Sequence, residues 1–318
     1  MILTITFNPS MDYSYITKKL ILGKVNRVEN PHISIGGKGI NAGRVASMSG
    51  EDVILTGVLG GENGQAILNT LINENRYQLE FKQIPGNSRN AVTIMHDSNT
   101  HTELVEKGIY ISKEIESQFY DHLTNLLLSN PIDVICISGS ANSDNEDFYC
   151  DLLNFLRSKL SDEFPILMDI SGTQLVNILK NKKCKPSFIK PNTHELSEIL
   201  NDVFETTESI IAALKQRLFN GIDLVMISRG SNGAIVKYQK QLYEVTIPKI
   251  ETINTTGSGD ATVGGMAYAL SQGYSINDSI KYSMACGMSN AKIETNGIID
   301  LSTVNSLLDQ IKVKKVCD

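Results

Sequence analysis

Residues 255–261 read Thr-Thr-Gly-Ser-Gly-Asp-Ala, and apolar helix-forming residues follow them. Main-chain N–H groups of Gly257, Ser258 and Gly259 would point outward from a helix start, where about half a positive charge collects. Such a terminus suits a phosphoryl group whose oxygens gain negative charge during transfer. Asp260, in the first turn, would then accept a proton from an attacking hydroxyl. Taken alone, the segment is equally consistent with a capped loop in which Asp260 only starts a helix.

A second glycine-rich segment, residues 36–46, reads Gly-Gly-Lys-Gly-Ile-Asn-Ala-Gly-Arg-Val-Ala. Adjacent glycines such as Gly37 let the main chain approach a ligand closely. Lys38 stands at the start of the helix that carries Asn41, where the macrodipole disfavours a cation unless an anion is bound. A flexible strand-to-helix turn with a solvated lysine explains the segment equally well.

Two shorter segments follow predicted strands. Residues 228–233 (Ser-Arg-Gly-Ser-Asn-Gly) form a glycine-rich turn, and open α/β sheets usually bind ligands at such strand ends. Residues 190–196 (Lys-Pro-Asn-Thr-His-Glu-Leu) begin another helix, in which Asn192 is the cap and Glu195 completes a capping box. That box accounts for both residues without any chemistry.

The sequence lacks the motifs that several other classes of functional site require. No GxSxG segment occurs, and none of the five histidines is near a nucleophile elbow, which argues against a hydrolase triad. The chain has no GxxxxGK[ST] loop, and no GxGxxG follows the first strand, which disfavours a dinucleotide-dependent dehydrogenase. The five cysteines form neither CxxC pairs nor zinc spacings, so we expect no disulfide framework or structural zinc.

The 318 residues carry a net charge of −6 without a basic run, which argues against a nucleic-acid partner. The first thirteen residues have no basic n-region and resemble a strand rather than a signal peptide. No apolar run is long enough to span a membrane. A reduced, cytoplasmic setting is therefore expected, with no membrane partner.

The elements that must position these residues alternate between β-rich runs and amphipathic stretches. Near-continuous apolarity of the β-rich runs is typical of strands covered on both faces. The runs are residues 2–7, 53–60, 133–139, 164–171, 186–192 and 222–230. Helical spacing follows in residues 112–130, with Ser112 as the cap, and in residues 144–160 and 206–219. This alternation predicts a parallel sheet flanked by helices.

Two regions break the alternation. Residues 12–35 show apolar residues without helical spacing, and residues 89–108 resemble a hairpin with an Asp-Ser-Asn turn at 97–99. We expect these regions to pair into a small sheet that projects from the main body.

Five segments occur in an order that resembles the ribokinase-like sugar kinases of the phosphofructokinase-B family. They are NPSMD at 8–12, GGKGIN at 36–41, KPNTHEL at 190–196, SRGSNG at 228–233 and GSGDA at 257–261. The resemblance covers essentially the whole chain. It implies one kinase domain over residues 1–318, a three-layer α/β/α fold with a mostly parallel sheet, and a β lid at about 12–35 and 89–108.

The resemblance also implies roles for individual residues. Asp260 is the expected base and Gly257–Gly259 the expected anion hole. The expected sugar ligands are Asp12, Gly37, Lys38 and Asn41, and the expected ligands of the sugar's phosphate are Arg27, Lys38 and Arg89. The expected ATP ligands are Lys190, Ser228, Gly230, Gly233 and Asn290, and Asn192 and Glu195 are expected to reach Mg²⁺ through water. Lids of this kind also imply a homodimer.

Within the family, residues 102–112, 257–265 and 287–300 are most similar to the tagatose-6-phosphate kinase subgroup. Asn254 and the pair Thr262-Val263 fit it too. The implied reaction is ATP-dependent phosphorylation of the C1 hydroxyl of a ketohexose 6-phosphate, foremost tagatose 6-phosphate. Phosphorylation of fructose 1-phosphate at C6 is the alternative, and a catalytically silent sugar-phosphate sensor is the alternative of another class. Two departures are Arg229, where relatives often carry an apolar residue, and Asn254, where many carry Asp.

Overall fold

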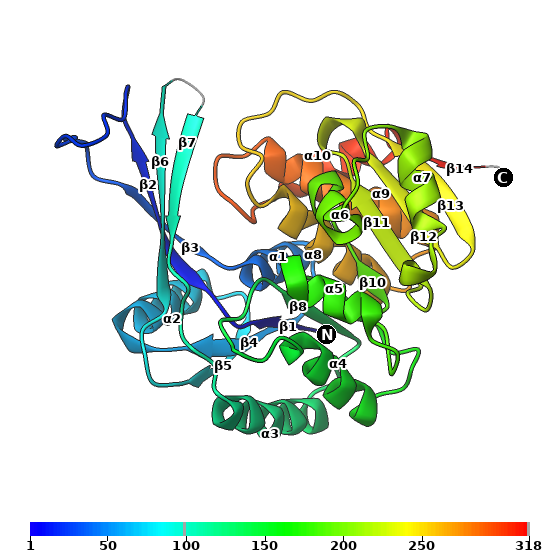
Figure 1. The fold of residues 1–318 in the computed structure, drawn as a ribbon, viewed down its shortest axis with the longest axis horizontal. Helices are drawn as coiled ribbons and strands as arrows, with labels where there is room; N and C mark the ends of the chain where they lie inside the picture. Colours follow the sequence, from blue (N-terminus) through cyan, green and yellow to red (C-terminus); the bar gives the residue numbers. More distant parts are fainter. Residues whose placement is uncertain (98–99, 317–318) are drawn as a thin grey trace.

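The computed structural model describes residues 1–97 and 100–316 of the chain. Within this part, the strands form a ten-stranded sheet at the centre and a four-stranded sheet that projects beyond α2 (Gly61–Glu74) (Figure 1). Seven adjacent strands of the large sheet, β5 to β11 in space, run parallel, and the last three are antiparallel. In spatial order the strands are β14 (Lys312–Lys315), β13 (Gln241–Thr246), β12 (Ala234–Tyr238), β11 (Leu224–Ser228), β10 (Phe188–Ile189), β9 (Ile166–Asp169), β8 (Val134–Ser138), β1 (Ile2–Thr6), β4 (Val53–Leu59) and β5 (Gln78–Gln83).

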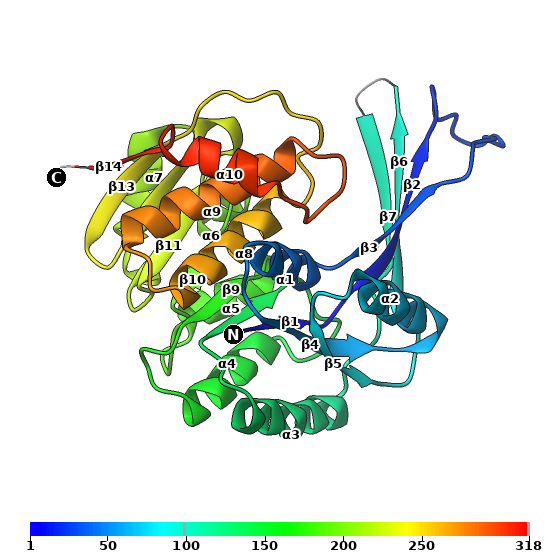
Figure 2. The same cartoon turned by 180° about the vertical axis from the view of Figure 1, so that it is seen from behind.

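Helices cover both faces of this sheet and create a separate core on each side (Figure 2). Neighbouring residues of one strand enter opposite cores, as Ile2 and Leu3 of β1 do, because side chains alternate along a strand. One face carries α1 (Lys38–Met48), α2, α8 (Ser258–Ser271), α9 (Ile276–Ala291) and α10 (Leu301–Leu308). The other carries α3 (Lys113–Ser129), α4 (Phe148–Lys159), α5 (Gly172–Lys180), α6 (Thr193–Leu200) and α7 (Thr207–Leu214). The predicted three-layer α/β/α fold is confirmed.

Each of the six predicted buried runs contains a strand of the large sheet, and Ser112 caps α3 by accepting a bond from the N–H of Ile115. The strands β5, β12, β13 and β14 were not predicted. In the β12–β13 hairpin, Gln239 takes a φ of 52°, a conformation that Gly or Asn usually marks in a sequence.

The small sheet has the strand order β3-β2-β6-β7 and joins the two regions that break the alternation. Its strands are β2 (Ser10–Ile16), β3 (His32–Gly36), β6 (Arg89–His96) and β7 (Thr100–Val105). β2 pairs in parallel with β6, so that Asp12 lies opposite Ala91, two residues from Arg89. The hairpin pairing of β6 with β7 is confirmed, and of its predicted turn only Asp97 belongs to the described residues, while 98 and 99 lie outside them.

No helix within residues 1–97 and 100–316 is both long enough and apolar enough to cross a bilayer. Four cysteines of the described chain (Cys136, Cys150, Cys184 and Cys286) are free thiols, and Cys317 lies outside it.

Candidate active site

The segments that carry the candidate site residues converge where α1 and α8 begin, beyond the carboxyl ends of the parallel strands (Figures 1 and 2). The two helices approach closely because α8 presents Gly264 to α1. A Cβ atom at Gly264 would lie 2.3 Å from the carbonyl oxygen of Ala42. This contact brings the first turn of α8 beside the first turn of α1, two segments separated by more than 200 residues.

Asp260 lies in the first turn of α8 and is 9% exposed. Nδ2 of Asn41, on α1, donates to its Oδ2 at 2.9 Å. Burial raises the pKa of Asp260 to about 6, and the nearby charge of Asp169 adds to the rise. Lys38, the Asn41 hydrogen bond and Lys190 act in the opposite direction. A buried carboxylate that ionises near neutral pH has the properties of a general base.

Asp169, at the end of β9, is a site residue that the sequence analysis missed. Its carboxylate lies 3.6 Å from Nζ of Lys38 through Oδ2 and 3.6 Å from Nζ of Lys190 through Oδ1. Ser138 of β8 donates to Oδ2 at 3.4 Å. Burial raises the pKa of Asp169, but the two lysines outweigh burial and lower it overall. An aspartate at the carboxyl end of a predicted buried strand is the signal that could have revealed it.

Asp169 therefore holds two ammonium groups beside Asp260. Its charge is the main cause that raises the pKa of Lys38, so this lysine stays protonated. Lys190 is 6% exposed, and a Cβ atom at Gly259 would lie 3.2 Å from its Nζ. Both cations thus lie next to the glycine loop, where a phosphoryl group would need them.

The glycine loop leads into α8 without a capping side chain. Gly257 is the N-cap residue, with a φ of 79° that an L-residue with a side chain rarely adopts. Among the described residues no side chain bonds to the N–H groups of this terminus, but the N–H of Ser258 donates to the carbonyl of Thr255 at 3.2 Å. Ser258 is the first helical residue, and its carbonyl accepts from Thr262 at 2.8 Å. The start of α8 thus leaves the N–H groups of Gly257 and Gly259 without a partner among the described residues, which is favourable for an anion beside Asp260.

Asn290, expected to contact adenosine, is fully buried in α9. Its Nδ2 donates to the carbonyls of Thr295 and Ile298, and its Oδ1 lies 3.5 Å from the hydroxyl of Ser258. Asn290 thus connects α9 to the segment at Thr295–Ile298 and to the first residue of α8. A contact with a nucleotide would require this packing to open, and the role of Asn290 at the nucleotide stays a prediction.

Asp12 and Arg89 lie together at the base of the small sheet. Ser10 donates to Oδ1 of Asp12 at 2.6 Å, and burial raises the pKa of Asp12 although the charge of Arg89 lowers it. A Cβ atom at Gly36 would lie 2.2 Å from Oδ2 of Asp12. Burial lowers the pKa of Arg89, and its buried Nε has no hydrogen-bond partner in the described structure. These two side chains form a polar pair of opposite charge beside α1.

Gly37, the N-cap residue of α1, has a φ of 136° and leaves no room for a side chain. A Cβ atom there would lie 3.3 Å from side-chain atoms of Thr6 and Ile40 and 3.4 Å from the main chain of Pro9.

Arg27 differs in its position from the other residues expected to bind the sugar phosphate. It is exposed in the irregular stretch between β2 and β3, and the structure shows no hydrogen bond or ion pair from it to another described residue.

The turn at 228–233 lies beside the segment at 190–196. Ser228, the last residue of β11, forms a bridge with Asn192, and its N–H donates to the carbonyl of Pro191 at 3.0 Å. Gly230 and Gly233 have φ values of 56° and 79°. A Cβ atom at Gly233 would lie 2.0 Å from the carbonyl of Val245, so only glycine fits there. The two segments are therefore neighbours in the structure.

Arg229 turns away from this neighbourhood. Its Nη1 donates to the hydroxyl of Thr207 at 2.9 Å and lies 4.0 Å from Oε1 of Glu244. The residue thus links α7 to β13, and its departure from an apolar residue has a structural explanation.

Asn192 and Glu195 form the capping box that the sequence permits. Asn192 Oδ1 accepts from the N–H of Glu195, and Glu195 Oε2 accepts from the N–H of Asn192, both at 2.8 Å. Oε1 of Glu195 accepts no hydrogen bond from the described residues, and the charge of Glu195 contributes to the raised pKa of Lys38. Glu195 can therefore cap α6 and still offer one oxygen toward the site. The described chain has no cluster of three or more His, Cys, Asp or Glu residues that could hold a metal by itself.

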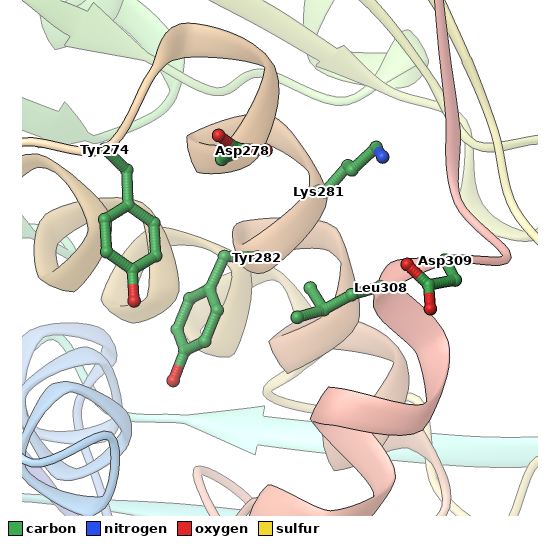
Figure 3. A pocket seen from close by; sticks show the side chains of 6 residues that line it. All are labelled: Tyr274, Asp278, Lys281, Tyr282, Leu308 and Asp309. Carbon is green, nitrogen blue, oxygen red and sulfur yellow. The ribbon is translucent and has the colours of Figure 1, made fainter.

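A surface pocket of about 360 Å³ lies elsewhere, between α9 and the end of α10 (Figure 3). Its lining residues are Tyr274, Asp278, Lys281, Tyr282, Leu308 and Asp309. Its residue Tyr274 follows the end of α8, and that end lies about 16 Å along the helix axis from Asp260. The pocket is therefore separate from the charged site at the strand ends.

Comparison with solved structures supports the fold. A candidate phosphofructokinase from Staphylococcus aureus is 26% identical, with a TM-score of 0.80 and 99% of each chain covered. A possible 1-phosphofructokinase from Thermotoga maritima is 22% identical, with a TM-score of 0.86 and full coverage of both chains. Phosphofructokinase-2 from Escherichia coli, solved with potassium, is 21% identical, with a TM-score of 0.86 and coverage of 97% of this chain and 98% of its own.

The family model described as pfkB family carbohydrate kinase matches residues 6–299. This range contains all the glycine-rich segments and the charged site around Asp260. The chain belongs to the pfkB family of carbohydrate kinases.

Proposed function

We propose that this sugar kinase transfers the γ-phosphoryl group of ATP to the C1 hydroxyl of a ketohexose 6-phosphate, foremost tagatose 6-phosphate. The observation that carries the proposal is the buried Asp260, with a pKa of about 6, at the uncapped glycine-rich terminus of α8. Two lysines and the polar pair Asp12–Arg89 lie on the adjoining elements. A base, cations for phosphoryl oxygens and ligands for a phosphosugar are thus supplied at the carboxyl ends of the parallel strands and at the adjoining small sheet.

The chemical step follows from this arrangement. Asp260 accepts the proton of the C1 hydroxyl while that oxygen attacks the γ-phosphorus in line. The bond from phosphorus to the β–γ bridging oxygen breaks, and ADP leaves with the electron pair. Main-chain N–H groups of Gly257 and Gly259 stabilise the charge that develops on the transferred oxygens, and the N–H of Ser258 would join them once its bond to the carbonyl of Thr255 opens. Lys190, held by Asp169, adds a cation on the same side.

Mg²⁺ fits the site as an ion carried by the nucleotide. Protein sites for nucleotide-bound Mg²⁺ usually contribute one or two carboxylates and leave the remaining ligands to phosphates and water. Oxygen Oε1 of Glu195 is suited to hold a water of such an ion, with Asn192 in the same capping box. When bound, Mg²⁺ would neutralise charge on the phosphate oxygens. Turn residues Ser228, Gly230 and Gly233 would contact the nucleotide phosphates.

The identity of the sugar is tested by a coupled assay that detects ADP. Purified protein receives Mg²⁺ and ATP with tagatose 6-phosphate, fructose 6-phosphate or fructose 1-phosphate. We expect the highest kcat/KM with tagatose 6-phosphate. Preference for fructose 1-phosphate would replace the proposal by C6 phosphorylation, the reaction suggested by the name of the Thermotoga relative. Absence of turnover with all three would favour a silent sensor, although a sensor would not need Asp260.

The pH dependence of the reaction should follow the ionisation of Asp260. Because the base acts only when deprotonated, kcat/KM should fall about tenfold for each pH unit below a midpoint near 6. Initial rates between pH 4.5 and 8.5, with the phosphosugar's own ionisation subtracted, measure this limb. An acid limb centred near 4, the ordinary range of an aspartate, would contradict the role of a buried base.

Arg89→Ala should mainly raise KM for the phosphosugar. Arg89 offers a guanidinium with an unpartnered Nε, which suits a phosphate oxygen, whereas it makes no contact with the loop at Gly257. Loss of one charge-assisted contact corresponds to an increase in KM of about 10- to 100-fold. Steady-state kinetics with varied phosphosugar and saturating ATP measure this KM. Arg27→Ala, which removes an exposed arginine, is the matched variant. An unchanged KM in Arg89→Ala would remove this residue from the phosphate site.

The small sheet is proposed to act as a lid over the sugar and as the surface of a homodimer. It exposes large apolar side chains, including Ile16 at 74% and Leu104 at 62%, and such patches on a soluble protein usually mark an interface. The tetrameric form reported for Escherichia coli phosphofructokinase-2 shows that a relative of this fold assembles. Ile16→Asp/Leu104→Asp should convert a dimer to a monomer in analytical ultracentrifugation. Leu128→Asp, an equally exposed change at the end of α3, should leave the mass unchanged.

A further inference from the structure

A continuous run of hydrogen bonds leads from the end of α2 to the carboxylate of Asp260. Arg44 donates to both oxygens of Glu74, from Nε to Oε2 at 2.9 Å and from Nη2 to Oε1 at 2.7 Å. From Nη1 it also donates to Oδ1 of Asn41 at 3.1 Å. Asn41 completes the run by donating from Nδ2 to Oδ2 of Asp260 at 2.9 Å.

Arg44 decides which end of the Asn41 amide faces the base. The two orientations of an asparagine amide have nearly the same shape, but only the oxygen accepts and only the nitrogen donates. A guanidinium has no acceptor, so the atom that faces Arg44 must be Oδ1. Nδ2 then faces Asp260, where it donates. A flipped amide would place Oδ1 against the carboxylate of Asp260 and Nδ2 against the guanidinium, which are two repulsive contacts.

The surroundings of Arg44 keep this orientation in place. Its side chain is 6% exposed, and Asn41 is also buried, so water cannot readily substitute for either partner. Tyr77 donates to Oε2 of Glu74 at 2.6 Å and so holds the carboxylate that anchors the guanidinium. Bidentate pairing with Glu74 fixes the plane of the guanidinium as well as its position. The remaining Nη1 is thereby directed at Asn41.

We propose that Arg44 is a positioning residue, which acts through the Asn41 amide to keep the carboxylate of Asp260 hydrogen-bonded, ionised and oriented toward the attacking hydroxyl. The inference rests on the proposed function, in which Asp260 is the base. Arg44 itself touches neither reacting atom. Its effect should therefore appear in the pH at which the base ionises more than in the affinity for either substrate.

Other groups that face Asp260 contribute to the same ionisation and have to be kept constant. They are Lys38 on α1, Asp169 at the end of β9, Lys190 after β10 and the buried thiol of Cys136 on β8. None of them hydrogen-bonds to Arg44 in the described part of the chain. Substitutions at Arg44 consequently leave these four groups in place.

The test compares two substitutions of Arg44 in a Glu74→Gln background, so that no buried carboxylate is left unpaired. Arg44→Gln keeps a donor for Asn41 without the charge, whereas Arg44→Met has no donor. The acid limb of kcat/KM should move upward by about one pH unit in the Met variant, because a carboxylate that loses a hydrogen bond is harder to ionise. At pH 6 this is about a fivefold loss of kcat/KM, which approaches tenfold at pH 5 and is small at pH 8. In the Gln variant the limb should stay near its original position.

A structural role alone would give a different pattern. Arg157 is a matched control, because it is a half-buried arginine of α4 that donates to the carbonyls of Ser161, Phe164 and Lys185. Arg157→Met should lower Tm without moving the acid limb. If the Met variant at Arg44 also lowers Tm but leaves the limb in place, the proposal is overturned. An equal shift in the Gln and Met variants would likewise overturn it, since charge rather than amide orientation would then be responsible.

A second readout does not depend on turnover. The side-chain carboxyl carbons of ¹³C-labelled aspartates can be titrated by NMR, with the Asp260 resonance assigned through its absence in Asp260→Asn. The midpoint for Asp260 should rise in Arg44→Met/Glu74→Gln and should not rise in Arg44→Gln/Glu74→Gln. An unchanged midpoint in the Met variant would overturn the inference even if no sugar phosphate is a substrate. Inactivity of the wild-type protein would instead count against the proposed function alone.

Discussion

Asp260→Asn should lower kcat by about 10²- to 10⁴-fold, the range that a positioned general base contributes. The change preserves the shape of the side chain and its place in the first turn of α8, and it removes only the capacity to accept the hydroxyl proton. ATP affinity should remain close to that of the wild type, because the loop at Gly257 to Gly259 is unaltered. Single-turnover rates, together with nucleotide titration by fluorescence or calorimetry, measure the two effects separately.

The same substitution should stabilise the fold at neutral pH. Folding raises the pKa of Asp260 above its unfolded value, so the ionised carboxylate reduces stability at pH 7. This cost disappears as the pH falls through the folded and then the unfolded pKa. Asp260→Asn should therefore raise Tm at pH 7 and bring little gain at pH 4. A loss of activity accompanied by a lower Tm would indicate damage to the fold instead of loss of the base.

Asp278→Asn is the matched control for this prediction. Asp278 is also an acid in the first turn of a helix, α9, and it lies in the pocket remote from the site. If Asp260 served only to start its helix, the two substitutions would have similarly small effects. Near-normal turnover in Asp260→Asn would end the assignment of the base.

Lys190→Met should lower kcat by about 10²- to 10³-fold, a loss comparable to removal of one donor from an anion hole. The ammonium group is buried, paired with Asp169 and next to Gly259, so it is placed for the transferred phosphoryl group. The charge on these oxygens increases as the transition state forms. Binding of ATP in the ground state should consequently weaken much less than kcat falls.

The loss of a buried cation could also disturb the fold, so Lys185→Met is its control. Lys185 is half-buried and donates to the carbonyls of Ile178 and Leu179, away from the charged site. Its replacement should lower Tm with only a small change in kcat. Equal losses of kcat in the two variants would contradict a specific role for Lys190. Inorganic phosphate should raise the Tm of the wild type, and it should raise the Tm of Lys190→Met less. This measurement does not depend on turnover.

Several parts of the fold follow from local patterns in the chain. Continuous apolar runs at 2–7, 53–60 and 133–139 each became a buried parallel strand, since a strand covered on both faces has no polar side. By contrast, β5 alternates Gln, Leu, Glu, Phe, Lys and Gln at a sheet edge, and the turn after β12 has neither Gly nor Asn. Edge strands and unmarked turns carry weak local signals, which is why these were missed.

Residue types and their local order account for the chemical groups that this protein brings to its site. Glycines at positions with positive φ, such as Gly257 and Gly233, and an acid in a first helical turn are properties of residue type and local order. Their linear order also revealed the family. The capping box of Asn192 and Glu195 was predictable for the same reason, because its partners are three residues apart.

How these residues act on one another depends on the packing of elements that are far apart in the chain. Asn41 meets Asp260 across 219 residues because α1 and α8 pack through Gly264, and Asp169 meets Lys190 because β9 and β10 are neighbours in the sheet. This packing also turned Arg229 toward Glu244, buried Asn290 and left Arg27 exposed. A pKa, an ion pair or an amide orientation depends on distances and burial, and these exist only once the strands are ordered and the helices are packed.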